Sequence, residues 1–550
     1  MTQTNNNNAT AVSASPYANY SAPQKQLIDF DRNEGVIALL MLVAGFFFAR
    51  YVFANNLGFF TSFFFILLMA VDLVFLSKKG YKLSYYHLTL VGIYFAFSAA
   101  FSLTGNNFVK SLDAVFLMLL GAYTIFAICN ERNKTGKFFA FDMLKSVFGV
   151  PLSGFGYAPR AIKSGKGKGA KNVWFAVLGV AIAVPLLFVV IGLLSEADAG
   201  FEQALSDFFK NIRLNKIIVI VFEILIGIPV AFYLFGLVFS NTRGLKSFYL
   251  TDDYNEMKTR KLRFAPSVTI YAAATPLILV YAAFIVIQLN YFFSAFNGVL
   301  PKGFSYSEYA RRGFFELFAI ALINLAVIIL MTVFSKWKDD NEKPVVLKVY
   351  TTVLSVLTLF IIATAFSKMM LYISDLGLTR KRVNTSWFMI LLTFLFIAII
   401  IKQFAKRFSV STVMGIVFTM MFAFLCFGSV DELIATYNIQ MYKASEYTQK
   451  LDVAALVQLS DDGWITMLEN KDLPEIKNYE LGNAVEFDEE NNIYYQFGDE
   501  CIDNENDGRA YGGTFKEICQ QKYEYLQMSK FNRCNASSIK LKLLLEQVIK

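Results

Sequence analysis

His87 is the only histidine in the chain, and this limits the catalytic chemistry that the sequence can support. A Ser-His-Asp triad, a Cys-His pair or a metal site with several imidazoles would each have to be built on that one residue. The sequence also contains no HExxH motif and no Ser-His or Asp-Asp pair at a recognised spacing. We therefore expect neither an enzyme of these classes nor a bound cofactor, and we interpret His87 as an interface residue rather than a proton relay.

Carboxylates within apolar segments are the residues best placed to carry a function. An ionisable side chain costs about 2.5 to 3.5 kcal/mol or more at the centre of a membrane helix, so each one invites a functional hypothesis. At ~1.5 Å per residue from the outer end of its predicted helix, Asp113 lies ~6 Å deep and Glu223 ~9 Å deep, with Glu316 near that level. We expect these three carboxylates to belong to one outer layer.

Further charged residues on the outer side extend this predicted layer. Glu308, Arg312 and Glu316 are spaced i, i+4 and i+8, which places them on one helical face. A basic cluster before the tenth predicted helix runs against the usual distribution of positive charge and therefore needs acidic partners. We expect Glu316 to pair with Arg312 or with that cluster. The residues of this predicted polar layer are Glu223, Glu308, Arg311, Arg312, Glu316, Arg380 and Arg382.

Two further features lie at other depths in the predicted membrane helices. Asp72 falls near the inner end of the second predicted helix and is expected to pair with Lys78 and Lys79. Pro229 follows Glu223 within one apolar segment, where a broken helix could open a binding site.

The C-terminal part of the chain contains one weak candidate for a metal site. Asp503, Glu505 and Asp507 alternate like the first ligands of a calcium loop. Thr514 stands at the twelfth position, where such a loop needs a bidentate Glu. We therefore favour an acidic, solvated turn over a calcium site, and the sequence predicts no other metal site.

The elements that position all these residues are membrane helices. Of the 550 residues, 56% are hydrophobic, 16% are aromatic and only 17% are charged, a composition that excludes an ordinary soluble protein. Apolar runs of about 20 residues recur, and each can cross a ~30 Å hydrocarbon core. We predict an all-α polytopic membrane protein with about eleven spans. They lie at about 35–53, 57–77, 84–103, 110–129, 173–194, 217–239, 266–290, 313–334, 345–370, 386–401 and 410–430.

The distribution of Lys and Arg predicts the orientation of these spans. With the N-terminus inside, the cytoplasmic loops hold roughly twice as many basic residues as the outer loops, and an odd number of spans exports the C-terminus. This predicts a plasma-membrane protein with a disordered cytoplasmic tail at 1–34, a helical membrane domain at 35–430 and an acidic extracytoplasmic region at 431–550. The pattern at 138–149 predicts an amphipathic interfacial helix, and the basic linker after it is expected to touch anionic lipid.

The region 431–550 differs in composition from the rest of the chain. It holds 22 Asp and Glu against 12 Lys and Arg, so the positive charge belongs to the membrane domain and needs no nucleic-acid partner to explain it. We expect a small α-rich domain that is marginally stable without support from the membrane domain. Cys501, Cys519 and Cys534 could form one disulfide, and the sequence does not choose among the three pairings.

Four stretches of the chain resemble a known group of proteins. They are SEADAGFEQAL, EYARRGFFELFAIALIN, GLTRKRVNTSWFM and ELIATYNIQMY, which together cover about 170 to 460. The sequence is similar to bacterial polytopic membrane proteins grouped as domain of unknown function 4173, with a neighbouring group numbered 4153. The resemblance implies a membrane topology and gives weight to the external motifs, but it implies no activity. The matching residues are Tyr309, Arg311, Gly313, Phe314, Phe315, Glu316, Gly377, Leu378, Thr379, Arg382, Trp387 and Phe388.

Two classes of function compete for this sequence. A transporter or permease needs kinked spans and a site near the bilayer centre or in its outer half, and the sequence offers both the kinks and the charged outer layer. A cell-envelope sensor or scaffold needs a rigid membrane core and an external reader, which the acidic exported region suits. An intramembrane enzyme with Glu223 and Glu316 as an acid-base pair is a third hypothesis. We take the transporter as the first hypothesis, with the lipid bilayer and an unknown small solute or protein as partners.

Overall fold

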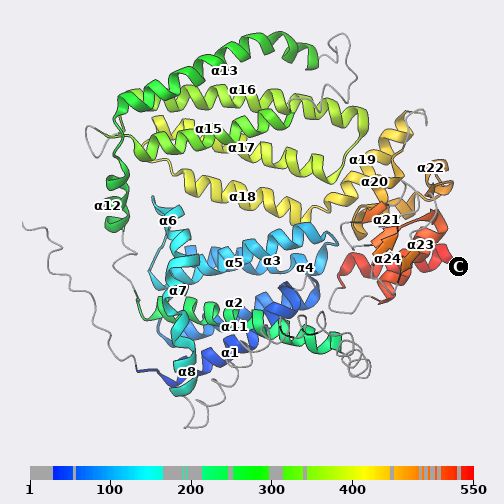
Figure 1. The fold of residues 1–550 in the computed structure, drawn as a ribbon, viewed down its shortest axis with the longest axis horizontal. Coiled ribbons are helices and arrows are strands. Elements are labelled where there is room, and N and C mark those ends of the chain that lie inside the picture. Colours follow the sequence, from blue (N-terminus) through cyan, green and yellow to red (C-terminus); the bar gives the residue numbers. More distant parts are fainter. Residues whose placement is uncertain are drawn as a thin grey trace, which may run out of the picture.

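The computed structural model of the chain is built mainly from long helices that lie side by side (Figure 1). The residues that it describes are 29–53, 57–164, 214–245, 252–296, 314–337, 343–445, 451–481, 486–488, 493–495, 502–504, 509–528 and 534–550, together with Val190 and Leu194.

Ten helical segments among the described residues are long and apolar enough to cross a membrane. Each coincides with one of the predicted spans, so the all-α polytopic class is confirmed. The remaining predicted span, at about 173–194, lies outside the described residues except for Val190 and Leu194, which are helical and exposed. The ten segments are formed by α1 (Arg32–Phe48) with η1 (Ala49–Phe53), α2 (Phe59–Lys78), α3 (Tyr85–Ser98) with α4 (Ala100–Leu103), α5 (Asn107–Cys129), α11 (Leu214–Thr242), α13 (Ser267–Phe296), α15 (Phe314–Phe334), α16 (Val345–Leu376), α17 (Arg380–Phe404) and α18 (Val410–Phe427).

Polar side chains define the starts of several of these helices. In each case the side-chain oxygen accepts a hydrogen bond from the backbone N–H three residues later, which satisfies one of the amides that a helix start leaves without an intrahelical partner. These N-cap residues are Ser84, Asn106, Thr379 and Ser409. These polar residues, just outside the apolar segments, therefore fix where each helix begins by capping its first turn.

The bundle has two chemically different ends. At the first, which we call the basic end, Lys79 Nζ and Arg243 Nε lie 3.1 and 2.7 Å from the carboxylate of Glu34. The second, which we call the tail end, carries the C-terminal region, coloured orange to red in Figure 1. Among the described membrane helices, α5 and α11 both run from the tail end to the basic end, and residues 165–213 between them lie outside the described residues apart from Val190 and Leu194. The others alternate in direction along the chain.

The membrane helices form two groups (Figure 1). In one group, α13, α15, α16 and α17 enclose a core that includes Leu354 and Phe396. In the other, α1, α2, α5 and α11 pack around Met41 and Phe235. α18 joins the groups, because it contacts α17 on one side and α4 and α5 on the other.

α1 and α11 approach each other closely through small residues. A Cβ atom on Gly45 would lie 2.8 Å from Cβ of Ala231 and would overlap the carbonyl oxygen of Gly227. Side chains this small let two membrane helices pack backbone against backbone. Pro229 lies inside α11, which continues through it, so the helix break that the sequence allowed is not formed.

Short helices cover the basic end. They are α6 (Phe139–Leu144), η2 (Lys145–Gly149), α7 (Val150–Gly154), η3 (Phe155–Tyr157), α8 (Ala158–Ser164) and α12 (Asp252–Leu262). The segment 138–149 was predicted as an interfacial helix, and it is helical from Phe139 onward. Its polar residues Asp142 and Ser146 are buried, whereas Leu144 and Phe148 are 57% and 59% exposed. Leu144 and Phe148 therefore point away from the protein, whereas Phe138, at the start of the segment, is buried, and the interfacial position of the helix remains a prediction.

The region after α18 folds into a small domain of helices and short strands, which we call the tail domain. Three antiparallel strand pairs, which the sequence did not predict, are β1 (Glu480–Leu481) with β6 (Gly513–Thr514), β2 (Glu486–Asp488) with β3 (Ile493–Tyr495), and β4 (Ile502–Asn504) with β5 (Arg509–Tyr511). The helices are α19 (Val430–Ala444), α20 (Val453–Val457), α21 (Asp461–Glu469), α22 (Pro474–Lys477), α23 (Phe515–Met528) and α24 (Ala536–Ile549).

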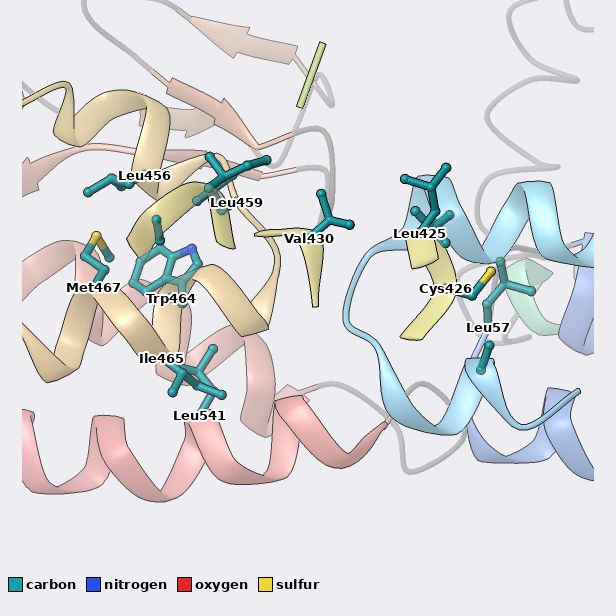
Figure 2. Close-up of a cluster of buried hydrophobic side chains, with 14 of the residues drawn as sticks. Leu57, Leu425, Cys426, Val430, Leu456, Leu459, Trp464, Ile465, Met467 and Leu541 are labelled. Carbon is teal, nitrogen blue, oxygen red and sulfur yellow. The ribbon is translucent and has the colours of Figure 1, made fainter. Parts of the chain in front are cut away.

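The tail domain and the membrane helices share one continuous hydrophobic core. Trp464 is fully buried and lies among Leu456, Met467 and other apolar side chains of the tail domain (Figure 2). The same cluster continues through Val430 to Cys426 at the end of α18. The tail domain is therefore packed onto the bundle rather than tethered to it.

The cysteines of the tail domain are only partly described. Cys519 is buried as a free thiol, and burial raises its pKa to about 12. The two disulfide pairings that need Cys519 are therefore not formed. The third pairing joins Cys534 to Cys501, which lies outside the described residues.

Candidate functional site

Glu223, from the predicted polar layer, forms an ion pair inside the second helix group. Its side chain is 6% exposed, and Oε2 lies 3.3 Å from Nη1 of Arg50, where α1 ends. This contact joins α11 to the end of α1. Among the described residues of the predicted layer, it does not bring Glu223 to Arg380 or Arg382, whose contacts lie elsewhere.

Arg380 joins the membrane helices to the tail domain. Its Nε lies 3.0 Å from both carboxylate oxygens of Asp431, and its Nη2 lies 2.7 Å from Oδ2. The Oδ2 atom also accepts hydrogen bonds from Asn106 Nδ2 at 3.2 Å and from the backbone N–H of Ser460 at 3.0 Å. We call these four residues the Asp431 clamp. It holds the starts of α5, α17, α19 and α21 together around one buried carboxylate.

Arg382 caps the turn between α16 and α17. Its Nη1 donates to the carbonyl oxygens of Leu376, at 2.9 Å, and Gly377, and its guanidinium carbon lies 4.0 Å from the ring centroid of Tyr372. Gly377 has a φ of 74°, a left-handed conformation that favours glycine. Arg382 therefore satisfies the last carbonyls of α16, which carry partial negative charge.

The remaining members of the predicted layer are only partly described. Glu316 lies in the first turn of α15 with an exposed side chain and interacts electrostatically with Lys368. Arg380 and Arg382 make the contacts given above instead of reaching Glu316. Pairing of Glu316 with Arg312, or with Lys381 of the basic cluster, remains a prediction, as does the solute-binding role of the whole layer. The layer residues that lie outside the described part of the chain are Glu308, Arg311 and Arg312.

Asp72 does not make the ion pair that was expected with Lys78 or Lys79. Lys79 contacts Glu34 and, at 3.6 Å, Asp31, because these carboxylates lie at the same end of the bundle as the end of α2. Asp72 lies about 9 Å further along α2 at ~1.5 Å per residue, and its side chain points into the bundle. It is 3% exposed.

Asp72 and Asp113 are buried carboxylates for which the described residues provide no cationic partner. Asp113 is 0% exposed and neither of its carboxylate oxygens has a hydrogen-bond partner, and Oδ1 of Asp72 also has none. Both interact electrostatically with the hydroxyl of Tyr94 on α3. Burying a carboxylate without a partner costs desolvation free energy and destabilises the folded protein. Neither residue therefore has an evident stabilising role.

A cavity of about 270 Å³ lies beside Asp72 in the middle of the second helix group. Its walls come from α1, α2, α3, α5 and α11. Tyr94, Gly121, Pro229 and Tyr233 line it together with Asp72, and the other lining residues are apolar. The arrangement is an apolar chamber with one carboxyl group and two phenols, which suits a small ligand or a few water molecules.

His87 has a structural role. Its Nδ1 accepts a hydrogen bond from the backbone N–H of Ser84 at 3.2 Å, and its Nε2 lies 3.1 Å from the carbonyl oxygen of Arg132. Both ring nitrogens are thus used to hold the start of α3 against the segment after α5.

Most of the calcium-site candidate lies outside the described residues. Asp503 lies in β4, whereas Glu505 and Asp507 are outside the described residues. Among the described residues no group of three or more His, Cys, Asp or Glu side chains is placed to hold a metal ion.

The chain matches a family of proteins with an unknown function. A model of the domain of unknown function DUF4153 matches residues 90–470. The chain belongs to the DUF4153 family. No curated protein and no solved structure matches it. The part that carries the DUF4153 match includes Tyr94, Asp113 and the Asp431 clamp, whereas Asp72 precedes it.

Two of the stretches that resemble the family contact each other in this DUF4153 chain. Leu378, in GLTRKRVNTSWFM, donates its N–H to Oδ1 of Asn438 at 2.7 Å and accepts a hydrogen bond from Nδ2 at 2.9 Å. Trp387, in the first of these stretches, donates its indole N–H to the carbonyl oxygen of Met421 at 2.8 Å. These DUF4153 motifs therefore fix the turn between α16 and α17 against α18 and α19.

Several residues of the site were not found by sequence reasoning. Tyr94 is one of 28 tyrosines and has no distinguishing neighbour in the sequence. Glu34 and Asp431 stand at the boundaries of apolar segments, where acidic residues are common. Asp113 was found as an intramembrane carboxylate, but its distance from any cation depends on how the helices pack.

Proposed function

We propose that this protein is a transporter or permease-like membrane protein whose binding site is the cavity beside Asp72. The observation that carries the proposal is the combination of an apolar mid-membrane cavity with an unpaired carboxyl group on its wall. Stability does not explain such a group, because an apolar residue at the same place would avoid the desolvation cost. Transporter sites typically lie near the bilayer centre and use a few polar groups among apolar walls.

The depth of the cavity supports this proposal. Met69 and Leu117, both on its wall, each lie about 15 Å from the tail-end starts of their helices at ~1.5 Å per residue, which is half of a ~30 Å hydrocarbon core. Pro229, which also lines the cavity, removes one backbone hydrogen bond from α11 and weakens the helix locally. A wall that includes such a helix can move more easily than one made of unbroken hydrogen-bond ladders.

We further propose a plasma-membrane location with the basic end in the cytoplasm. The arrangement of α8 and α11 supports eleven spans. α8 packs against α1 near its start at the basic end, whereas α11 begins near Arg50 at the tail end. The end of α8 and the start of α11 therefore lie at opposite ends of the bundle, which is the placement that a span predicted at 173–194 requires. Eleven crossings place the tail domain outside if the N-terminus is inside.

Cysteine accessibility tests the proposed cavity without knowledge of the substrate. In a variant whose native cysteines are replaced by Ser, Met69→Cys and Leu117→Cys each place a thiol on the cavity wall. We expect a small water-soluble thiol reagent to label both from at least one side of the membrane. Ala127→Cys is the matched control, because Ala127 is also fully buried on α5 but does not line the cavity.

The alternative, a cell-envelope sensor or scaffold, is favoured by the Asp431 clamp. A clamp that joins the tail domain rigidly to the bundle suits a protein that passes a signal from an external domain to the membrane helices. Under this alternative, Met69→Cys and Leu117→Cys stay unlabelled from both sides of the membrane, like the control Ala127→Cys. That result would contradict the transporter proposal.

A further inference from the structure

Asp72 brings a carboxyl group to the wall of the cavity in the second helix group. Phe65, Met69 and Asp72 all line this cavity, and their spacing of i, i+4 and i+7 places them on one face of α2. Asp72 is 3% exposed, and its Oδ1 has no hydrogen-bond partner. This face of α2 therefore presents a carboxyl group among apolar side chains.

The ring of Tyr94 on α3 lines the same cavity and is held in place by packing. It meets the ring of Phe65 at an interplanar angle of 73° with the centroids 6.4 Å apart, an edge-to-face arrangement that aromatic pairs favour. A Cβ atom on Gly121 would lie only 3.0 Å from Cε2 of Tyr94, so this glycine lets the backbone of α5 approach the ring. Contacts with α2 and α5 therefore fix the Tyr94 ring in the cavity wall before any ligand binds.

Tyr233 on α11 adds a second phenol ring to the wall. Its hydroxyl donates a hydrogen bond to the carbonyl oxygen of Val147 at 2.8 Å, and Val147 does not line the cavity. This donor is therefore already used, and a ligand in the cavity meets Tyr233 chiefly as an aromatic ring.

The charges on the cavity wall are suited to a cation. No Lys or Arg is among the described residues that line the cavity, so Asp72 has no basic neighbour on the wall. A carboxylate and the electron-rich faces of aromatic rings both attract positive charge and repel negative charge. Burying the carboxylate alone is unfavourable, and a bound cation would act as its missing counter-ion.

We propose that this cavity binds a small organic cation, with an ammonium or quaternary ammonium group beside Asp72 and an apolar body against the rings of Phe65, Tyr94 and Tyr233. The proposal rests on the proposed transport function and names the class of solute. A volume of about 270 Å³ lies just below the range of about 300 to 1,000 Å³ that is typical of ligand pockets, so the solute must be small.

The cavity suits an organic cation better than a metal ion. A hard metal cation needs several oxygen ligands. The side chains that line the cavity offer the carboxyl group of Asp72 and the hydroxyl of Tyr94, since the hydroxyl of Tyr233 is bonded to Val147. A quaternary ammonium group needs no oxygen ligands and binds well against aromatic rings.

Protection of a cavity thiol from labelling tests the cation site in the full-length protein. The reporter is the Leu117→Cys variant described above, with Asp72 intact. The probe is phenyltrimethylammonium, whose charge does not depend on pH, and the comparison is tert-butylbenzene, which has the same shape and no charge. We expect the free concentration that halves the labelling rate to be lower for the cation by about tenfold or more, because only the cation gains the counter-ion and ring contacts.

Two substitutions show which carboxyl group provides this preference. Asp72→Asn keeps the shape of the side chain and removes its charge, so the advantage of the cation should be lost while tert-butylbenzene protects as before. Asp113→Asn is the matched control, because Asp113 is also a buried carboxyl group without a hydrogen-bond partner but does not line the cavity. It should keep the full advantage. The comparison of the two probes with Asp72 intact decides the proposal even if Asp72→Asn folds poorly.

Uptake of radiolabelled phenyltrimethylammonium into liposomes separates binding from transport. A K⁺ diffusion potential that is negative inside drives entry of the cation through the reconstituted protein. We expect wild type and Asp113→Asn to take up the cation at similar rates, and Asp72→Asn to be close to protein-free liposomes. Protection of the thiol without uptake would support the cation site and contradict the proposed transporter.

The outcomes of the protection experiment separate this proposal from the one on which it rests. Equal protection by the two probes with Asp72 intact, or an advantage of the cation that persists in Asp72→Asn, would overturn the organic-cation site. Equal protection by Na⁺ at the same concentration would also overturn it, in favour of a metal-ion site. In each of these cases a labelled thiol leaves the proposed transporter standing with a different class of solute, whereas a thiol that no reagent labels contradicts the transporter itself and the cation site with it.

Discussion

The buried charged residues of this protein divide into two kinds according to what surrounds them. Glu34, Glu223 and Asp431 each have a basic side chain within 3.3 Å. Asp72 and Asp113 have no such partner among the described residues. A buried ion pair offsets its desolvation cost only when geometry and additional hydrogen bonds are good, as around Asp431. The first kind therefore explains how helices are held together, and the second kind includes the carboxyl group on which the proposed transport function rests.

Lys343 shows the effect of burial on a cation at the basic end. Its Nζ donates to Thr351 Oγ1 at 3.1 Å and to Gln403 Oε1 at 2.7 Å, both neutral acceptors. Burial, together with repulsion from Lys348, lowers its pKa from 10.5 to about 8. Between these two pH values the unfolded chain binds a proton that the folded protein does not bind. The stability contributed by Lys343 is therefore fully present above about pH 10.5 and is lost as the pH falls to about 8.

Lys343→Met should remove this pH dependence. We expect the melting temperature of the wild-type protein in detergent to gain more between pH 8 and pH 10.5 than that of the variant. Lys540→Met, at a lysine whose side chain is 61% exposed, should keep the wild-type slope. Equal slopes for wild type and Lys343→Met would contradict the burial argument.

At the scale of helices, the sequence predicts well which segments form membrane helices, and poorly which way each helix turns its polar side chains. An apolar run of about 20 residues has essentially one stable conformation in lipid, so the ten described membrane helices could be placed from composition. Composition could not predict the direction in which a helix turns its few polar residues, because α2 and α5 are apolar on most sides. Asp72 was therefore expected to pair with Lys78 and Lys79, whereas in the structure it lines the same cavity as Tyr94.

Gly45 tests the packing of α1 against α11. Alanine favours a helix over glycine by up to about 1 kcal/mol, so Gly→Ala in an uncrowded helix should not destabilise the protein. At Gly45, however, the added Cβ would overlap the carbonyl of Gly227 and force the helices apart. We expect Gly45→Ala to lower stability by about 1 to 3 kcal/mol, as overpacking does.

Gly92→Ala is the matched control for this measurement. Gly92 lies within α3, and a Cβ atom there would meet nothing within 4 Å. The melting temperature in detergent should therefore fall for Gly45→Ala and stay constant or rise for Gly92→Ala. A similar fall in both would show that the close approach of α1 and α11 is not what limits stability.

At the scale of the molecule, the tail domain and the bundle behave as one packed unit. Asp462 accepts hydrogen bonds from the N–H of Gly105, at 3.1 Å, and from Ser537, and burial raises the pKa of its carboxyl. Lys522 and Asp461 pair within the tail domain at 3.3 Å. The composition predicted an acidic domain that needs support from the membrane helices. It could not predict which residues give that support, because Asn106, Arg380 and Asp431 are far apart in sequence.

The Asp431 clamp makes this dependence testable. Asp431→Ala leaves the guanidinium of Arg380, only 18% exposed, without its carboxylate, and breaking a buried pair in this way costs about 3 to 5 kcal/mol. We therefore expect a large fall in melting temperature and release of the tail domain by limited proteolysis. Glu256→Ala is the control, because it breaks an ion pair with Arg260 whose side chains are 40% and 44% exposed, and such pairs contribute about 0 to 1 kcal/mol.

Joint replacement of Arg380 and Asp431 tests whether the clamp stabilises the protein through its ion pair or only by holding the tail domain in place. Arg380→Met with Asp431→Leu removes both charges and fills the site with apolar groups, which is often neutral or stabilising for a buried ion pair. If the clamp only holds the tail domain in place, the double variant should recover most of the melting temperature and resist proteolysis again. A double variant that stays as unstable as Asp431→Ala would show that Asn106 and the N–H of Ser460 need the carboxylate itself, since two buried donors would then lack an acceptor.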